Sequence, residues 1–147
     1  MLQTEDEISA CTMAIGAAYA GARAFTATAG PGLSLMAEAI GLAEMTETPL
    51  VVIDTQRGGP STGLPTKHEQ SDLMAAIYNT HGDTAKIVIS PSSIEESFYD
   101  TFEAFNLAED YQCPVIVLSD LQLSLGKHSV TSLDYGKLQV RRGKLVK

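Results

Sequence analysis

The stretch Leu50-Val51-Val52-Ile53 is an uninterrupted apolar run, and it leads into Gln56-Arg57-Gly58-Gly59-Pro60-Ser61-Thr62, whose Gly and Pro residues end regular structure. A continuously apolar strand is typical of a parallel sheet that is covered on both faces. In such sheets, ligands bind where the strands end in loops, at the carboxyl edge. This stretch therefore predicts both a fold class and the place of a site.

Other segments repeat this alternation of short apolar strands and helices. Strands are predicted at residues 23–29, 50–53, 86–90 and 115–119, and helices at residues 5–20, 33–45, 69–79 and 91–109. The order favours an α/β fold with a doubly wound, mostly parallel sheet and helices on both faces. We expect this domain to cover residues 1–122. Polar and apolar residues alternate after Lys137 and turn at Arg142-Gly143, so residues 123–147 predict a tail or a hairpin.

Composition excludes several classes of function. The 147 residues are 44% hydrophobic and 19% charged, as in one globular domain. A net charge of −8 disfavours nucleic acid and an anionic membrane surface as partners. The chain has no apolar run of about 20 residues, and its N-terminal segment is acidic, so neither a membrane span nor a secretory signal is expected. Two cysteines outside any metal or redox motif predict a reduced, cytoplasmic protein.

Three loops are candidates for a ligand site: residues 28–33, 54–66 and 79–83. In the first, Gly30-Pro31-Gly32 precedes a helix and could bring backbone N–H groups close to an anion, although it could equally be a plain strand-to-helix turn. It matches neither the dinucleotide motif nor the P-loop. In the second loop, the Arg57 guanidinium beside flexible backbone suits a carboxylate or phosphate, and an ordinary turn remains the alternative.

Glu7 allows two interpretations. Acidic residues at a helix start are favoured by the helix dipole, so Glu5, Asp6 and Glu7 could form a solvated N-terminus. Glu7 also leads into an apolar helix, and a carboxylate at the edge of a buried surface can share a proton with a nitrogen heterocycle. The three histidines are not spaced as metal ligands, no metal site is predicted, and no strand is followed by a serine nucleophile motif.

Six segments, in this order along the chain, resemble the α subunit of 2-oxoacid:ferredoxin oxidoreductases, most closely the 2-oxoglutarate type. The resemblance covers roughly residues 5–120. The segments are Glu5-Asp6-Glu7-Ile8-Ser9-Ala10, Thr26-Ala27-Thr28-Ala29-Gly30-Pro31-Gly32, Met45-Thr46-Glu47-Thr48-Pro49-Leu50, the loop from Gln56 to Thr66, Thr80-His81-Gly82-Asp83 and Ala104-Phe105-Asn106-Leu107-Ala108-Glu109.

This resemblance implies the pyrimidine-binding domain of a thiamine diphosphate enzyme. A glutamate at the position of Glu7 bonds N1′ of the aminopyrimidine there, which favours the imino tautomer that activates C2 of the cofactor. By the same resemblance, Gly30, Pro31 and Gly32 would shape the cofactor pocket. The residues expected to hold the substrate carboxylate or coenzyme A are Arg57, Gly58, Gly59, Ser61 and Thr62.

The implied reaction is oxidative decarboxylation of a 2-oxoacid, with 2-oxoglutarate as the expected substrate, to an acyl-coenzyme A with reduction of ferredoxin. A partner β subunit would carry the diphosphate-binding domain, its magnesium and the iron–sulfur cluster. We expect a homo- or hetero-oligomer in which thiamine diphosphate is shared between subunits.

The chain also departs from the family pattern. It starts almost at the glutamate, without the upstream strand and helix that carry a Tyr-Pro-Ile-Thr-Pro segment. We therefore expect a fragment, a split subunit or a truncated reading frame, inactive alone. Two other hypotheses stay open: a pyruvate-processing thiamine diphosphate enzyme of the acetolactate-synthase kind, against which the loop after Arg57 argues, and a non-catalytic assembly module of the same fold.

Overall fold

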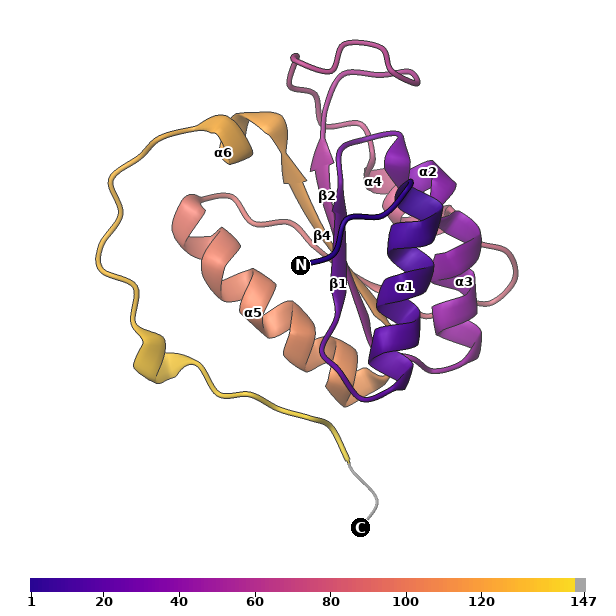
Figure 1. The fold of residues 1–147 in the computed structure, drawn as a ribbon. Helices are drawn as coiled ribbons and strands as arrows, with labels where there is room; N and C mark the ends of the chain where they lie inside the picture. Colours follow the sequence, from indigo (N-terminus) through magenta and orange to yellow (C-terminus); the bar gives the residue numbers. More distant parts are fainter. Residues whose placement is uncertain (145–147) are drawn as a thin grey trace.

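Four parallel strands form the central sheet of the computed structural model, which describes residues 1–144 (Figure 1). The strands are β1 (Phe25–Thr28), β2 (Leu50–Gln56), β3 (Ile87–Ile89) and β4 (Pro114–Asp120), and they lie in the order β1-β2-β4-β3. The central pair, β2 and β4, is hydrogen-bonded from Leu50 opposite Pro114 to Gln56 opposite Asp120. The predicted parallel α/β sheet is confirmed.

Helices cover both faces of this sheet (Figure 1). On one face lie α1 (Glu7–Tyr19), α2 (Gly32–Leu35), α3 (Ala37–Met45) and α4 (Leu73–Tyr78), and on the other lies α5 (Ile94–Tyr111). Successive residues of a strand point to opposite faces, so Leu50 and Val52 pack with the first group whereas Val51 packs with α5. Because both faces are buried here, β2 is apolar at every position from Leu50 to Ile53, as the sequence predicted.

Several element boundaries differ from those predicted; for example, α4 begins at Leu73 and not at residue 69. The helix expected over residues 33–45 is broken at Met36, which is fully buried and ends α2 as well as preceding α3. The first turn is tightened by bonds from Leu33 to the Gly30 carbonyl and from Met36 to the Leu33 carbonyl. Strand β2 also runs on to Gln56, so Asp54 lies inside the sheet rather than in the loop.

The C-terminal part of the described chain is an extended tail. After the short helix α6 (Leu121–Leu125) it runs past the 3-10 helix η1 (Tyr135–Lys137) and returns along α5 (Figure 1). No strand lies between residue 121 and residue 144, where the described chain ends. The last residues of the predicted hairpin, 145–147, lie outside the described residues.

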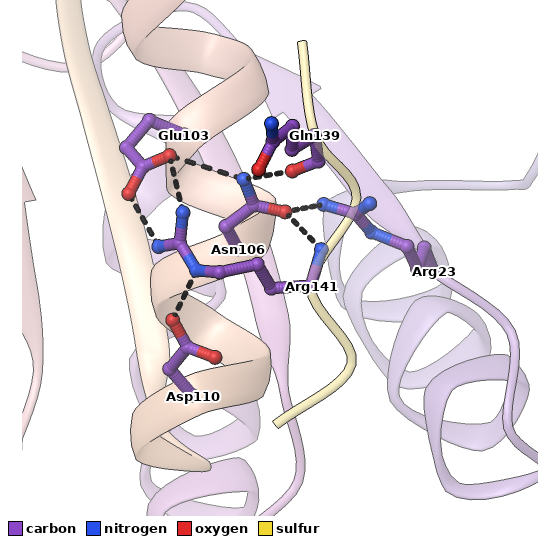
Figure 2. Close-up of polar contacts among 6 residues, drawn as sticks. All are labelled: Arg23, Glu103, Asn106, Asp110, Gln139 and Arg141. Carbon is purple, nitrogen blue, oxygen red and sulfur yellow. Dashed lines mark hydrogen bonds and ion pairs between the residues drawn. The ribbon is translucent and has the colours of Figure 1, made fainter. Parts of the chain in front are cut away.

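Asn106 of α5 fastens this tail (Figure 2). Its side chain is 1% exposed and donates to the Gln139 carbonyl at 3.0 Å, while its oxygen accepts from the Arg141 backbone N–H and from Arg23 Nη2, each at 3.0 Å. Arg142 Nη2 in turn donates to the Gly21 carbonyl at 2.7 Å. The tail thus joins α5 to the connection between α1 and β1.

Across the part of the chain that the structure describes, none of the helices combines the length and the apolar character needed to cross a bilayer.

Candidate active site

The carboxyl ends of β2 and β4 mark the place where the connections diverge. The chain leaves β2 toward α4, whose Ala76 packs with the α1–α3 core, whereas it leaves β4 into α6 near α5. Adjacent strands whose connections go to opposite faces open a crevice at the carboxyl edge of a doubly wound sheet. A hollow of about 330 Å³ between α5, α6 and the sheet lies on the α5 side of this edge.

Glu7 is placed by the start of α1. The Asp6 carboxylate accepts the Ser9 backbone N–H at 2.8 Å and caps the helix, and this bond lowers the pKa of Asp6. Glu7, the first helical residue, is half-buried, and its side chain lies against Gly32. A Cβ on Gly32 would come within 2.9 Å of Glu7 Oε1 and would overlap Thr28 Oγ1. The sequence therefore needs glycine here because Glu7 and Thr28 occupy that space.

The Gly30–Gly32 turn is held on β2. Gly30 has a φ of +65°, which favours glycine, and its N–H donates to the buried Asp54 Oδ1 at 2.9 Å. A Cβ on Gly30 would lie 3.1 Å from Arg57 Cγ, so the arginine stem packs against this turn. Pro31 is half-buried and is the residue before α2. The structure thus brings together Glu7, the turn and Arg57, which lie far apart in the sequence.

The loop after Arg57 is bonded to itself. Arg57 Nη1 donates to the carbonyls of Gly58 and Thr62 at 3.2 and 3.3 Å. The Gly58 N–H donates to the Lys67 carbonyl at 2.8 Å, and a Cβ on Gly58 would lie 2.9 Å from Leu64 Cβ. Gly58 therefore serves the packing of the loop itself.

The remaining residues predicted for this loop lie near its surface. The Gly59 N–H donates to Glu69 Oε2 at 3.3 Å, and both Ser61 and Thr62 are exposed. The hydroxyl groups of Ser61 and Thr62 are thus accessible on a loop whose two ends are joined by the bond from Gly58 to Lys67.

The third loop predicted as a candidate ligand site, residues 79–83, lies at the opposite edge of the sheet from Glu7 and Arg57. It follows α4 and precedes β3, so it lies at the amino edge, away from Glu7 and Arg57. Helix α4 has only six residues, yet it returns the chain from the carboxyl edge of the sheet toward the amino edge. The sequence pattern did not predict this return. Among residues 1–144 there is no group of three or more His, Cys, Asp or Glu side chains suited to a metal ion.

Two acids that the sequence analysis did not single out lie beneath the turn. Asp54 is fully buried on β2, and burial raises its pKa to about 7. Asp72, just before α4, also has a raised pKa because of burial. The sequence does show an acid, Asp54, directly after the apolar run, but the pattern predicts it as the first residue of the loop and not as part of the strand.

Comparison with known proteins identifies the family. Residues 1–145 match the sequence model described as pyruvate flavodoxin/ferredoxin oxidoreductase, thiamine diphosphate-binding. The chain belongs to this family. The resemblance found in the sequence is thereby confirmed.

Two curated relatives in this family are each 51% identical to the chain. One is the 2-oxoglutarate synthase subunit KorA of Methanothermobacter thermautotrophicus, with 97% of this chain and 38% of the relative covered. Another is the 2-oxoacid:ferredoxin oxidoreductase 1 subunit alpha of Aeropyrum pernix, with 98% of this chain and 22% of the relative covered. The chain thus spans well under half the length of these relatives.

A solved structure of the family is also similar. The 2-oxoglutarate:ferredoxin oxidoreductase from Magnetococcus marinus, with 2-oxoglutarate, coenzyme A and succinyl-CoA bound, aligns with a TM-score of 0.81 at 56% identity. The alignment covers 83% of this chain and 21% of that one.

The residues around Glu7 fit the pyrimidine end of thiamine diphosphate. The half-buried Glu7 carboxylate lies at a turn whose first and third residues have no side chain, and this lets Arg57 pack against Gly30 and Glu7 pack against Gly32. A carboxylate in such a place can hold a proton on a weakly basic ring nitrogen.

Proposed function

We propose that this chain forms the pyrimidine-binding part of the α subunit of a 2-oxoglutarate:ferredoxin oxidoreductase. The observation that carries the proposal is the 56% identity and TM-score of 0.81 with the Magnetococcus marinus enzyme, combined with the meeting of Glu7, the Gly30–Gly32 turn and Arg57 at one sheet edge. The reaction is oxidative decarboxylation of a 2-oxoacid to its acyl-coenzyme A.

Glu7 is the catalytic residue in this proposal. Its carboxylate would hold a proton on N1′ of the aminopyrimidine, and Gly30, Pro31 and Gly32 would shape the wall of the pocket around it. Thiamine diphosphate, when bound, supplies the carbon nucleophile that attacks the 2-oxo group. The position of Glu7 at the start of α1, next to a Gly32 without a side chain, supports this role.

Arg57 and its loop would bind an anion. Arg57 directly follows the end of β2, and its guanidinium uses Nη1 to hold two loop carbonyls. A substrate carboxylate or a phosphate of coenzyme A suits a guanidinium of this kind. Gly59 and the exposed Ser61 and Thr62 would add backbone and hydroxyl donors, and Gly58 would maintain the shape of the loop.

The remaining machinery would come from partners. A β subunit would hold the diphosphate with its magnesium and the iron–sulfur cluster, and ferredoxin would accept the electrons in the cytoplasm. We expect thiamine diphosphate to bind between subunits of a homo- or hetero-oligomer. The chain alone is therefore expected to be inactive.

Reconstitution tests the proposal. The chain would be combined with the remaining α-subunit segments and the β subunit, and dye reduction would be followed with 2-oxoglutarate or pyruvate in the presence of coenzyme A. We expect 2-oxoglutarate-dependent reduction that Glu7→Gln lowers at least about a hundredfold, as for loss of an acid–base group. Glu5→Gln, an exposed acid before the same helix, is the matched control and should keep full activity.

Three results would contradict this function. Full activity of Glu7→Gln would remove the assigned catalytic role. Consumption of pyruvate without dye reduction would favour the acetolactate-synthase kind of enzyme. No recruitment of a β subunit would favour an assembly module.

A further inference from the structure

Asp54 is the most deeply buried acid beneath the candidate site. Its residue is 0% exposed, and its Oδ1 accepts the Gly30 N–H at 2.9 Å. Its Oδ2 is also buried, and within the described part of the chain no N–H donor reaches it. A buried carboxylate oxygen without a donor is unfavourable, so the charge state of Asp54 needs an explanation.

Asp72 supplies the partner group. Its backbone N–H donates to Gln56 Oε1 at 2.9 Å, while Gln56 Nε2 donates to the Ser119 carbonyl at 3.2 Å. These bonds fix Asp72 beside the end of β2. Its Oδ2 is buried and, among residues 1–144, likewise lacks an N–H donor. Asp54 and Gln56 are two residues apart and so lie on the same face of β2, which places Asp72 beside Asp54. Burial and the nearby Asp72 together raise the pKa of Asp54.

Two carboxylates are both acceptors, so they can hydrogen-bond only when one of them carries a proton. Burial and the neighbouring Asp72 raise the pKa of Asp54, and burial raises the pKa of Asp72, so the pair holds a proton more readily than two separate aspartates. The charged groups facing the pair are Arg57, which favours ionisation of both acids, and Glu69, which opposes ionisation of Asp72. Neighbouring β1 contributes Thr28, and β4 contributes Leu118, opposite Asp54 in the sheet.

We propose that Asp54 and Asp72 share one proton and are positioning residues, because the neutral pair holds the Gly30–Gly32 turn on β2 and so fixes the places of Glu7 and Arg57. The turn is the common element: its first residue is bonded to Asp54 and packed by Arg57, and its third residue touches Glu7. The positioning role rests on the function proposed above, whereas the shared proton is a property of the chain itself.

The pH dependence follows from the raised pKa of Asp54. An ordinary aspartate in the unfolded chain loses its proton near pH 4, but the folded chain keeps this proton up to about pH 7. Stability from the pair is therefore complete below the unfolded pKa and is lost as pH rises through the folded one. Above it, two adjacent buried carboxylates repel and the turn loosens.

Carboxyl-carbon NMR of the full chain, labelled at aspartate, tests the shared proton without any cofactor. We expect one carboxyl signal to titrate near pH 7 and to vanish in Asp54→Asn. In Asp72→Asn the Asp54 signal should titrate at least about one pH unit lower, since an amide donor favours the ionised form. Asp83→Asn, at an exposed acid, should remove a different signal. If every aspartate titrates below about pH 5, the proposal is wrong.

Variants at position 54 test the positioning role in the reconstituted enzyme. Asparagine accepts the Gly30 N–H and donates permanently to Asp72, so Asp54→Asn should keep activity and extend it to higher pH. Alanine does neither, and Asp54→Ala should lower kcat at least about tenfold, as expected for misplaced groups. Equal losses in both variants would overturn the positioning role. A wild-type complex without activity would instead refute the proposed function, while the NMR titration still decides the shared proton.

Discussion

The Glu7 side chain lies directly against Gly32, so that a Cβ on residue 32 would approach Oε1 to 2.9 Å. This contact joins the start of α1 to the turn after β1, and no other residue type fits between them. The position of the carboxylate depends on a missing side chain as much as on the helix that carries it.

Gly32→Ala is therefore expected to destabilise the chain. The added methyl would overlap Thr28 Oγ1 and displace Glu7, and overpacking of this kind costs about 1–3 kcal/mol. Gly41→Ala in α3 is the control, because nothing lies within 4 Å of its added Cβ and the change should stabilise the helix by up to about 1 kcal/mol. Urea unfolding measures both, and equal effects would contradict the contact.

Arg57→Met should loosen the loop over the site. It removes the bonds to the Gly58 and Thr62 carbonyls, each worth about 1 kcal/mol. Hydrogen exchange at residues 58–67 should accelerate about fivefold or more. Lys67→Met, an exposed cation in the same loop, should leave the exchange unchanged. Unchanged exchange in Arg57→Met would show that the guanidinium does not hold the loop.

Lys86→Met should cost about 3–5 kcal/mol, because it leaves Glu44 buried without its cation. The two side chains are each 5% exposed and lie 3.4 Å apart, with Lys86 Nζ also donating to Thr80 Oγ1 at 2.5 Å. The double variant Lys86→Met with Glu44→Leu should recover much of this loss. A double-mutant cycle in urea measures the coupling, and strictly additive losses would contradict the pair.

Asn106→Leu should release the tail from α5. The change leaves the Arg141 backbone N–H and the Gln139 carbonyl without the partner they have in the structure, at about 1–3 kcal/mol for such groups. Limited proteolysis should cut the tail faster. Gln139→Ala is the matched control, since only the backbone of that residue bonds Asn106, and its digestion should resemble that of the wild type.

The strands were predictable because Leu50, Val51 and Val52 are buried on both faces, and continuous burial leaves a continuous apolar run. The break between α2 and α3 at Met36 was not predictable, because both flanking segments have helical composition and the break is set by tertiary packing. The residue types of Glu7 and Arg57 indicated chemistry. Their meeting at Gly30–Gly32 depends on sheet order, which no local pattern contains.

The burial of Asp54 could not be predicted from the sequence. Its charge made a loop the natural prediction, and its burial becomes understandable only with the Gly30 N–H and Asp72 in place. Asp72 comes 18 residues later in the chain, after a loop that folds back on itself. A single sequence does not indicate that two acids so separated lie together in the interior.

The bond from Arg142 to the Gly21 carbonyl spans 121 positions of the chain. During synthesis, the connection between α1 and β1 lacks this partner until Arg142 has left the ribosome. Closing so long a loop is entropically costly and favours late formation. The segment that leads from α1 to the sheet is thus expected to complete its contacts only after the part of the tail around Arg142 has been made.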